Sequence, residues 1–374
     1  MEGKMNLIYK DKQLIFLSLF IYITSILVGI GYLNISQGNL LIAISIFIIY
    51  FFQGIKNEFY ILDIFIIILN TIVIVFTKQV NLIFPSLLWM YNGIVRRSRI
   101  NLCSLKLILK FSVFFYIFII MSYYFFGFNL DKNIEMWRLT KIISRNSLGF
   151  THPNVAMLSA LSLLFYYLCI LTEKKDFRID KLIIPLIFLI ILYSLTLSRT
   201  TSIAVLMLFL LLLFRNKYFF CNKYLLNNFV ILLFILFFLI SISLLLIPSN
   251  SYFDELLSGR ITLYKSFFST TGFTLFGNST LEEAMFDNGY LQMLLSKGII
   301  YTAFFIIVVI GILKKRINYN ESSSWILIIF FTVAITETTL SKIELWIPLI
   351  ILLNLNLKSE EKYCNRMVGV NNGK

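Results

Sequence analysis

The sequence has little charge for its length. Charged residues make up 14% of the 374-residue chain, against about 25% in an average soluble protein. Hydrophobic residues make up 59%, above the usual value of about 45–50%, and the mean hydropathy is +0.86. No polar block between the apolar runs is long enough to hold a core of its own. The composition therefore excludes a soluble multidomain protein and predicts a polytopic helical membrane protein.

Cysteine is also scarce, and its positions argue against a disulfide framework or a metal site. All four cysteines fall in apolar runs or basic loops, and none lies in a segment that we expect outside the membrane: Cys103, Cys169, Cys221 and Cys364. The first apolar run is not followed by a small-residue cleavage site, so we expect a retained span rather than a signal peptide. Soluble-type repeats and low-complexity tracts are lacking as well.

The apolar runs predict an all-α fold with about twelve transmembrane helices in one integral membrane domain, residues 1–374. Several runs are shorter than the ~20 residues that a bilayer requires, so the spans around Arg199 are expected to be thinned, re-entrant or tilted. The expected spans are 14–33, 40–55, 59–77, 80–95, 107–128, 155–172, 182–197, 202–214, 227–248, 289–313, 324–336 and 343–357.

The positive charge is spread in short clusters between the spans. The net charge is +14, which in a soluble protein would suggest nucleic acid. Here the clusters, such as Arg96-Arg97 and Lys314-Lys315-Arg316, fall between every second pair of spans. This is the positive-inside pattern. We therefore expect both termini in the cytoplasm and no nucleic-acid partner.

Two polar segments on the expected outer side are longer than a helix connection needs. They are 129–154, between spans five and six, and 249–288, between spans nine and ten. Within the second, apolar residues recur at helical spacing from Phe253 to Phe268. This spacing predicts that Asp254–Phe268 is an amphipathic helix lying on the outer membrane surface.

Arginines on the outer side run against the charge bias and are candidate functional residues. Arg199 lies in a tight turn between two apolar spans, where an unpartnered guanidinium would cost roughly 2.5 kcal/mol or more within hydrocarbon. It would bind an anion or snorkel to lipid headgroups. Arg260 lies beside the apolar face of the predicted surface helix, and it would bind substrate or be solvated.

The chain has one histidine, His152, in Gly149-Phe-Thr-His-Pro-Asn just before span six. It would cap that helix or take part in catalysis. Asp287, in Asp-Asn-Gly-Tyr, opens span ten. It would cap the helix, orient an arginine or accept a sugar hydroxyl. The further expected substrate-binding residues are Arg138, Arg145, Asn154, Lys265 and Tyr290.

The layout and these motifs resemble the Wzy-type polysaccharide polymerases and the related O-antigen ligases. The motifs are the Gly-Phe-Thr-His-Pro-Asn start of a helix, the Ser198-Arg-Thr turn, and the Ser258-Gly-Arg loop ending in Asp-Asn-Gly-Tyr. They span roughly residues 130–300, and the layout extends the resemblance to the whole chain. Some family members carry Arg followed by Gly eleven positions on. Arg138 and Gly149 have that spacing, whereas Arg260 and Gly272 are one residue further apart.

The resemblance implies a glycosyltransferase of the bacterial cytoplasmic membrane whose donor is a glycan on a polyprenyl pyrophosphate. Arginine suits the pyrophosphate leaving group because its planar fork binds phosphate oxygens and stays charged. No Asp-x-Asp motif lies outside, so we expect neither metal nor cofactor. The acceptor hydroxyl needs a base or an oriented acceptor, and the sequence leaves His152, Asp287 and Glu283 open. Arg199 and Arg260, with His152 and Asp287, are the candidate catalytic residues.

Three other functions remain open at this point. A ligase would move the finished glycan to a different acceptor. A lipid-linked oligosaccharide transporter would place ionisable residues near the bilayer midplane and often shows repeated halves, whereas the conspicuous charges here lie at the outer face. A structural scaffold leaves Arg199 and Arg260 unexplained. For a polymerase we expect membrane lipid as a partner, with a chain-length regulator and a flippase as further candidates.

Overall fold

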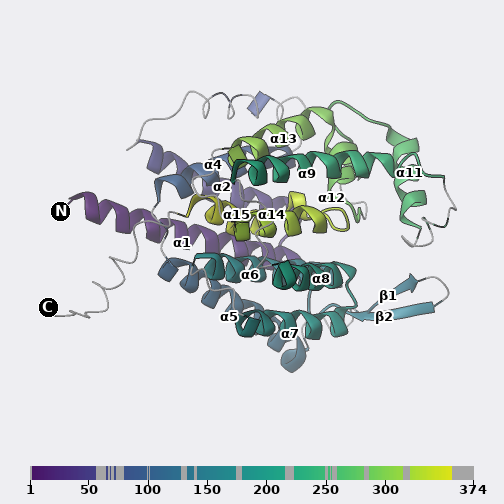
Figure 1. Ribbon diagram of the computed structural model, residues 1–374, viewed down its shortest axis with the longest axis horizontal. Helices are drawn as coiled ribbons and strands as arrows, with labels where there is room; N and C mark the ends of the chain where they lie inside the picture. The colour runs from purple at the N-terminus through teal and green to yellow at the C-terminus, as the bar shows by residue number, and fades with distance from the viewer. Residues whose placement is uncertain are drawn as a thin grey trace.

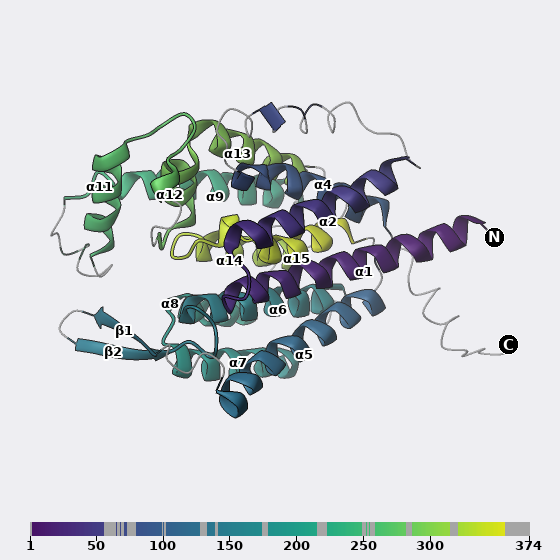
Figure 2. The same ribbon diagram turned by 180° about the vertical axis from the view of Figure 1, so that it is seen from behind.

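The protein is a bundle of long helices (Figures 1 and 2). The computed structural model describes residues 2–55, 65, 68, 71–72, 80–98, 100, 102–127, 133–138, 141–173, 179–214, 223–248, 252, 254, 259–281, 286–314 and 321–355. Most of the predicted span 59–77, the residue Glu283 and the segment that holds Lys175 lie outside the described residues.

Four helices are long and apolar enough to cross a membrane. They are α1 (Glu2–Gly29), α2 (Ile35–Ile55), α5 (Leu102–Phe126) and α6 (Pro153–Glu173). Their apolar stretches are 20 residues or longer, the length that matches the bilayer core. The bundle is completed by η1 (Val80–Ile83), α4 (Phe84–Arg97), α7 (Ile179–Thr196), α8 (Arg199–Phe214), α9 (Lys223–Ser243), α13 (Ile299–Lys314), α14 (Glu321–Val333) and α15 (Ile343–Asn354).

Charged residues lie near the ends of these helices. Arg96 and Arg97 end α4, and Glu344 lies in the first turn of α15. Lys106 and Lys110 lie in the first part of α5. The sides of the bundle instead expose large apolar side chains along α2, α5, α7, α8 and α9. Exposed apolar sides with charge confined to the ends match a bilayer. The protein is therefore membrane-embedded.

The centre of the bundle is α6, whose apolar span is 89% buried. Tyr116 of α5 donates a hydrogen bond from its hydroxyl to the carbonyl of Ala156 over 3.1 Å. Ser162 donates to the carbonyl of Glu344 over 2.7 Å. Buried hydroxyls need such partners, and these bonds fix α6 against α5 and α15. The start of α6 is thereby held in one position.

One end of the bundle carries β1, β2 and α11 and is called the loop end (Figure 1). The predicted outer loops gather there. The backbone N–H of Thr151 donates to the carbonyl of Gly29 over 2.7 Å, and that of Gly289 to Ala334 over 2.8 Å. At the opposite end, Asn354 closes α15 against α4 through a 2.9 Å bond to Asn92. In the predicted topology of twelve alternating spans, the outer loops all lie at one end of the bundle.

A β-hairpin is the exception to the all-α prediction within the described residues. Strands β1 (Asn133–Arg138) and β2 (Lys141–Asn146) pair antiparallel, with Asn133 opposite Asn146 and Arg138 opposite Lys141. After it, Gly149 adopts a φ of 85°, and a Cβ there would lie 2.9 Å from Tyr123. Glycine at 149 therefore has a steric reason to be there.

The predicted span 289–313 is not one helix. It is divided into α12 (Gly289–Gln292), a π-helical turn η3 (Met293–Lys297) and α13, with Gly298 at a φ of 90° between the last two. The carbonyls of Thr274 and Leu275 accept hydrogen bonds from the first two amides of α13 over 3.0 and 3.1 Å. The loop before α12 thus accepts hydrogen bonds from the first amides of α13, so a new helix can begin at Ile299.

The surface helix also differs from its prediction. Helix α11 runs from Arg260 to Thr271 and is preceded by Gly259 at a φ of 76°. Asp254 caps it, because its Oδ1 accepts from the amides of Ile261 and Thr262 over 2.8 and 3.2 Å. Ile261 and Tyr264 are buried in the protein rather than turned to lipid, and Tyr264 packs in a small cluster with Leu281, Phe286, Leu291 and Leu295.

Candidate functional site

Asn154, in the first turn of α6, joins three loops at the loop end. Its Oδ1 accepts a 2.7 Å hydrogen bond from Arg145 Nη2 and a 3.3 Å bond from Ser198 Oγ. Its Nδ2 donates over 2.9 Å to Glu337 Oε1. These partners fix which way the amide points. Asn154 therefore bonds a guanidinium through its amide oxygen and a carboxylate through its amide nitrogen.

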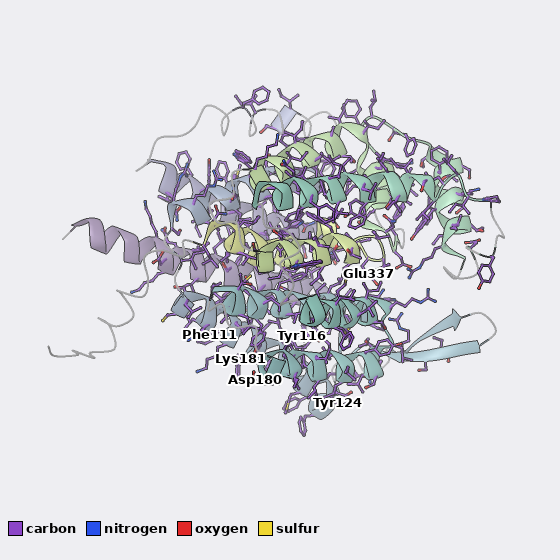
Figure 3. All side chains as sticks on the ribbon, viewed as in Figure 1. Phe111, Tyr116, Tyr124, Asp180, Lys181 and Glu337 are labelled. Atoms are coloured by element: carbon purple, nitrogen blue, oxygen red, sulfur yellow. The ribbon has the colours of Figure 1, made fainter. Side chains whose placement is uncertain are left out.

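Arg145 and Glu337 are deeply buried charges, with 3% and 4% of their surface exposed. Arg145 lies in β2, next to its last residue, and also donates from Nε to the carbonyl of Thr196 over 2.8 Å. A buried charge is costly unless it is hydrogen-bonded, and this pair is satisfied partly through the amide of Asn154. Figure 3 labels Glu337 towards the loop end, after α14.

His152 caps α6 from the preceding loop. Its carbonyl accepts from the amides of Val155 and Ala156 over 3.0 and 3.3 Å, and its Nδ1 accepts from the amide of Asn154 over 3.2 Å. A neutral imidazole has one acceptor and one donor nitrogen. With Nδ1 accepting, Nε2 carries the proton. In this arrangement neither ring nitrogen is available as a general base.

The surroundings of His152 also favour its neutral form. Burial lowers the pKa of His152 from its ordinary value, and the nearby Arg145 charge lowers it further, while Asp287 acts in the opposite direction. The ring therefore lies within electrostatic range of residues from two separate loops. The predicted capping role of His152 is present, and the base that was also considered for it is disfavoured.

Arg260 and Asp287 form an ion pair across the large loop. Arg260 Nη2 lies 2.9 Å from Asp287 Oδ2, and the two side chains are 13% and 24% exposed. The cap of α12 is instead Asn288, whose side chain accepts from the amides of Tyr290 and Leu291. Of the roles considered for Asp287, the structure therefore shows the orientation of an arginine.

Tyr264 brings this ion pair into range of Glu337. Burial raises the pKa of the Tyr264 hydroxyl. The positive charge of Arg260 lowers this pKa, whereas the carboxylates of Asp287 and Glu337 raise it. The two halves of the loop end, one built on α6 and the other on α11, thus share one electrostatic neighbourhood. We name this set the loop-end cluster: Arg145, His152, Asn154, Ser198, Arg260, Tyr264, Asp287 and Glu337.

The other predicted site residues have varied positions. Arg199 is half-buried and starts α8, next to Ser198 of the cluster. Lys265 is half-buried on α11. Arg138 ends β1 opposite Lys141. Tyr290 is fully buried, and its hydroxyl donates to the carbonyl of Phe331 over 2.9 Å. Tyr290 therefore holds α12 against α14 and has no surface for a substrate.

Sequence reasoning missed Glu337 and the importance of Asn154 as a link. Glu337 lies in the short segment 337–342, which the sequence shows only as a polar gap between two apolar spans. The one available signal was an acidic residue on the expected outer side beside apolar spans. Its partner, Asn154, lies 183 positions earlier in the chain, so no local pattern connects the two.

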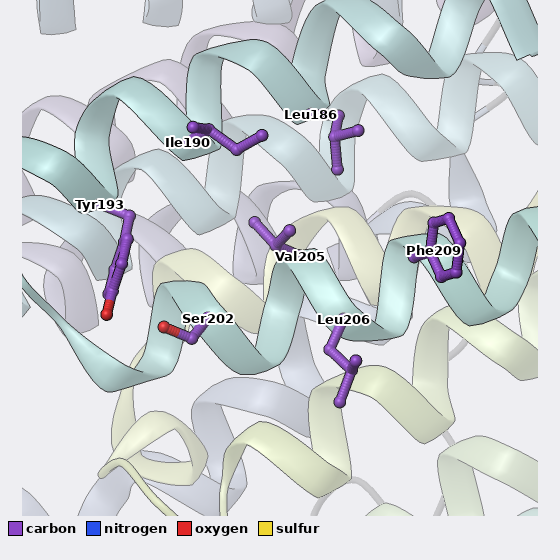
Figure 4. Close-up of a pocket in the computed structure, with 7 residues that line it drawn as sticks. All are labelled: Leu186, Ile190, Tyr193, Ser202, Val205, Leu206 and Phe209. Carbon is purple, nitrogen blue, oxygen red and sulfur yellow. The ribbon is translucent and has the colours of Figure 1, made fainter.

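An apolar groove lies between α7 and α8, on the side of the bundle that exposes apolar side chains (Figure 4). Its volume is about 390 Å³, and it is lined by Leu186, Ile190, Tyr193, Ser202, Val205, Leu206 and Phe209. Figure 4 shows the hydroxyls of Tyr193 and Ser202 at the same end of the groove. Ser202 is one helical turn from Arg199, so this end of the groove leads towards the loop end.

Comparisons with known proteins give no match: no protein-family profile, no curated protein and no solved structure is similar to this chain.

Proposed function

We propose that this protein is a polysaccharide polymerase of the bacterial cytoplasmic membrane, with the loop end outside the cell and both termini in the cytoplasm. It transfers a glycan from a polyprenyl-pyrophosphate donor onto a lipid-linked repeat unit. The loop-end cluster carries the proposal. It places buried and half-buried arginines and carboxylates from separate loops in one neighbourhood. This neighbourhood lies at the end of an apolar bundle, where the lipid tail of a donor would meet its water-soluble glycan.

The arginines suit the leaving group of this reaction. As the anomeric bond breaks, negative charge grows on the pyrophosphate, and positioned donors stabilise that charge. Arg260 is held in place by Asp287. Arg199 starts α8, where the helix amides also favour an anion. His152 contributes an Nε2–H donor. Cationic side chains in this proposal take the part that a metal ion takes elsewhere, without metal or cofactor.

The groove between α7 and α8 is suited to the other half of the donor. A polyprenyl tail is apolar, and the groove is lined almost entirely by apolar side chains. A tail lying there would reach the loop end beside Ser202 and Arg199. Membrane lipid would occupy the same groove when no donor is bound. A flippase that delivers the donor and a chain-length regulator are the partners that such a polymerase requires.

The arrangement of charges favours an enzyme over a transporter. In the described helices, charged side chains lie in the first or last turns, apart from Lys10, Asp11 and Lys12 in the first half of α1, Lys106 and Lys110 in the first part of α5, and Lys265 in α11. A transporter needs them near the midplane. A ligase would use the same cluster with a different acceptor, so the acceptor distinguishes these two enzymes.

The decisive experiment incubates purified, liposome-reconstituted protein with a polyprenyl-pyrophosphate-linked repeat unit. The expected result is a ladder of products that differ by one repeat unit. Transfer only to a separate acceptor, such as a lipid A core, would show a ligase. Movement of the donor across the bilayer without any new glycosidic bond would show a transporter. Products would be separated on gels and their linkage checked by mass spectrometry.

A further inference from the structure

The loop that connects α11 to α12 exposes three large apolar side chains within four positions. Phe273, Leu275 and Phe276 are 41%, 58% and 47% exposed. Single apolar residues on a protein surface are common, whereas an apolar group of this kind marks a contact with a protein or a membrane. The hydroxyl of Thr274, which lies between them in the chain, is buried in the protein. The exposed side of this segment is therefore apolar, although the sequence predicts that it lies in an external loop.

This loop is fixed to the first turn of α13. The carbonyls of Thr274 and Leu275 accept hydrogen bonds from the first two amides of α13 over 3.0 and 3.1 Å. Gly277 and Gly298 adopt φ values of 84° and 90°, and a Cβ at Gly298 would collide with the backbone of Gly277. In Figures 1 and 2 the chain that follows α11 runs to the end of α13 nearest the loop end. The backbone therefore holds Leu275 beside the start of α13.

Helix α13 carries an apolar stripe on the outside of the bundle. Ile299, Ala303 and Ile307 are exposed, and because they recur every four residues they lie on one face of the helix. Exposed apolar sides of the bundle face the membrane. The carbonyl of Leu275 bonds to the first turn of α13, so Leu275 lies where this membrane-facing stripe begins.

The length of α13 leaves part of the membrane core for another segment to cover. Its 16 residues span about 24 Å at about 1.5 Å per residue, whereas the hydrocarbon core is about 30 Å thick. The preceding α12 and η3 contribute mainly buried side chains, and Tyr290, Leu291 and Leu295 are fully buried. The apolar surface that α13 lacks on the loop-end side is therefore supplied by the segment Phe273–Phe276.

We propose that Phe273–Phe276 is inserted in the membrane, with the acyl chains of the leaflet at the loop end as its partner. The depth expected for such a segment is about 5–10 Å into the boundary between headgroups and acyl chains. Backbone groups in lipid need hydrogen-bond partners, and the carbonyls of Thr274 and Leu275 have them. The inference goes beyond the polymerase function and does not depend on it.

Lipid fits this surface better than a second copy of the chain, because the surface continues the membrane-facing stripe of α13. The loop also replaces the membrane contact predicted for α11, whose residues Ile261 and Tyr264 are buried in the protein. The ring centroid of Phe268, in the last turn of α11, lies 4.8 Å from that of Phe273. Insertion of the loop therefore holds the end of α11 at the membrane surface.

The test measures the depth of single labelled positions of the full chain in liposomes. With the four native cysteines replaced, Leu275→Cys and Phe276→Cys each carry an environment-sensitive nitrobenzoxadiazole fluorophore. The quenchers are iodide, present on both sides of the bilayer, and phosphatidylcholine with a spin label high on its acyl chain. Both positions should lose fluorescence to the spin-labelled lipid as strongly as Leu239→Cys, on the exposed side of α9. Iodide should quench them little. The matched control is Ser266→Cys, exposed on α11, which should respond in the opposite way.

The other outcomes contradict the inference. Iodide quenching of Leu275→Cys and Phe276→Cys at the level of Ser266→Cys would place the loop in water. Protection from both quenchers would show that protein covers the loop, and a disulfide between two chains at position 276 would identify that protein as a second copy. Gel filtration checks that each variant is folded. If one of the two variants does not fold, the other decides, because each position alone distinguishes lipid from water.

Discussion

The two ends of the bundle carry charge in different ways. At the end opposite the loops, charged side chains such as Arg96, Lys110 and Lys314 are exposed. At the loop end, Arg145 and Glu337 are 3% and 4% exposed, and Arg260 is 13% exposed in its ion pair with Asp287. Charge at the first end can be solvated. These loop-end charges are buried or half-buried in the protein.

This difference assigns separate roles to charges that look alike in the sequence. Exposed lysines and arginines between spans set the orientation in the membrane, and each is replaceable by another cation. Buried charges carry a desolvation cost that only a specific partner offsets, so their identity matters. The comparison predicts that substitutions at the loop end have large and specific effects, whereas those at the opposite end have small ones.

The largest expected effect is all-or-none and concerns the side of the membrane that each end of the bundle faces. In a chain whose four native cysteines are replaced, Ser144→Cys at the loop end should react with an impermeant thiol reagent added to intact cells. Arg96→Cys should react only after the membrane is opened. The physical reason is the positive-inside bias. Labelling of position 96 from outside would reverse the orientation and place the cluster in the cytoplasm.

Arg260→Ala should lower chain extension about 100-fold or more, the usual cost of removing a group that stabilises growing charge. Arg260→Lys should recover part of the rate, because it keeps the charge and loses the paired hydrogen bonds. Arg96→Ala, an arginine at the opposite end, is the matched control and should stay within twofold. Rates would be taken from the product ladder. A wild-type rate for Arg260→Ala would contradict the pyrophosphate role and favour a transporter.

Asn154→Ala should lower the free energy of unfolding by about 3 kcal/mol, because it removes a partner from both Arg145 and Glu337, and hydrogen bonds to charged groups are the stronger ones. Reversible unfolding in mixed micelles would measure it. The control is Ser194→Ala, whose hydroxyl donates to the carbonyl of Ile191 within the exposed face of α7. A loss below about 1 kcal/mol would show that the loops are held together by other contacts.

His152→Ala should have the smallest effect, a loss of about tenfold in kcat with a smaller change in donor Kd. The pKa of His152 is lowered in the fold, so the unfolded chain binds the proton more readily. Stability should therefore be complete above the ordinary imidazole value of about 6.5 and fall as the pH falls below it. His152→Asn, which keeps a capping oxygen, should remove this pH dependence; its persistence would assign it to another group.

The helical bundle could be predicted from the sequence because it depends on local pattern. Runs of apolar residues about 20 long must form helices in a bilayer, and α1, α5 and α6 contain the predicted spans almost completely. The charge bias also predicted that Arg145, His152 and Arg260 lie on the same side of the membrane. The break at Gly298 was not predictable, since it depends on hydrogen bonds that the carbonyls of Thr274 and Leu275 accept from the first amides of α13.

The sequence by itself determined that this is a helical membrane protein and which loops share a side. Only the tertiary structure decided how those loops combine. It made Asp287 the partner of Arg260, gave the cap of α12 to Asn288, and buried Tyr290 in the core. It also joined Glu337 to Asn154 across 183 residues. Hydropathy is a property of neighbours along the chain, whereas a buried charge is satisfied by whatever the fold brings beside it.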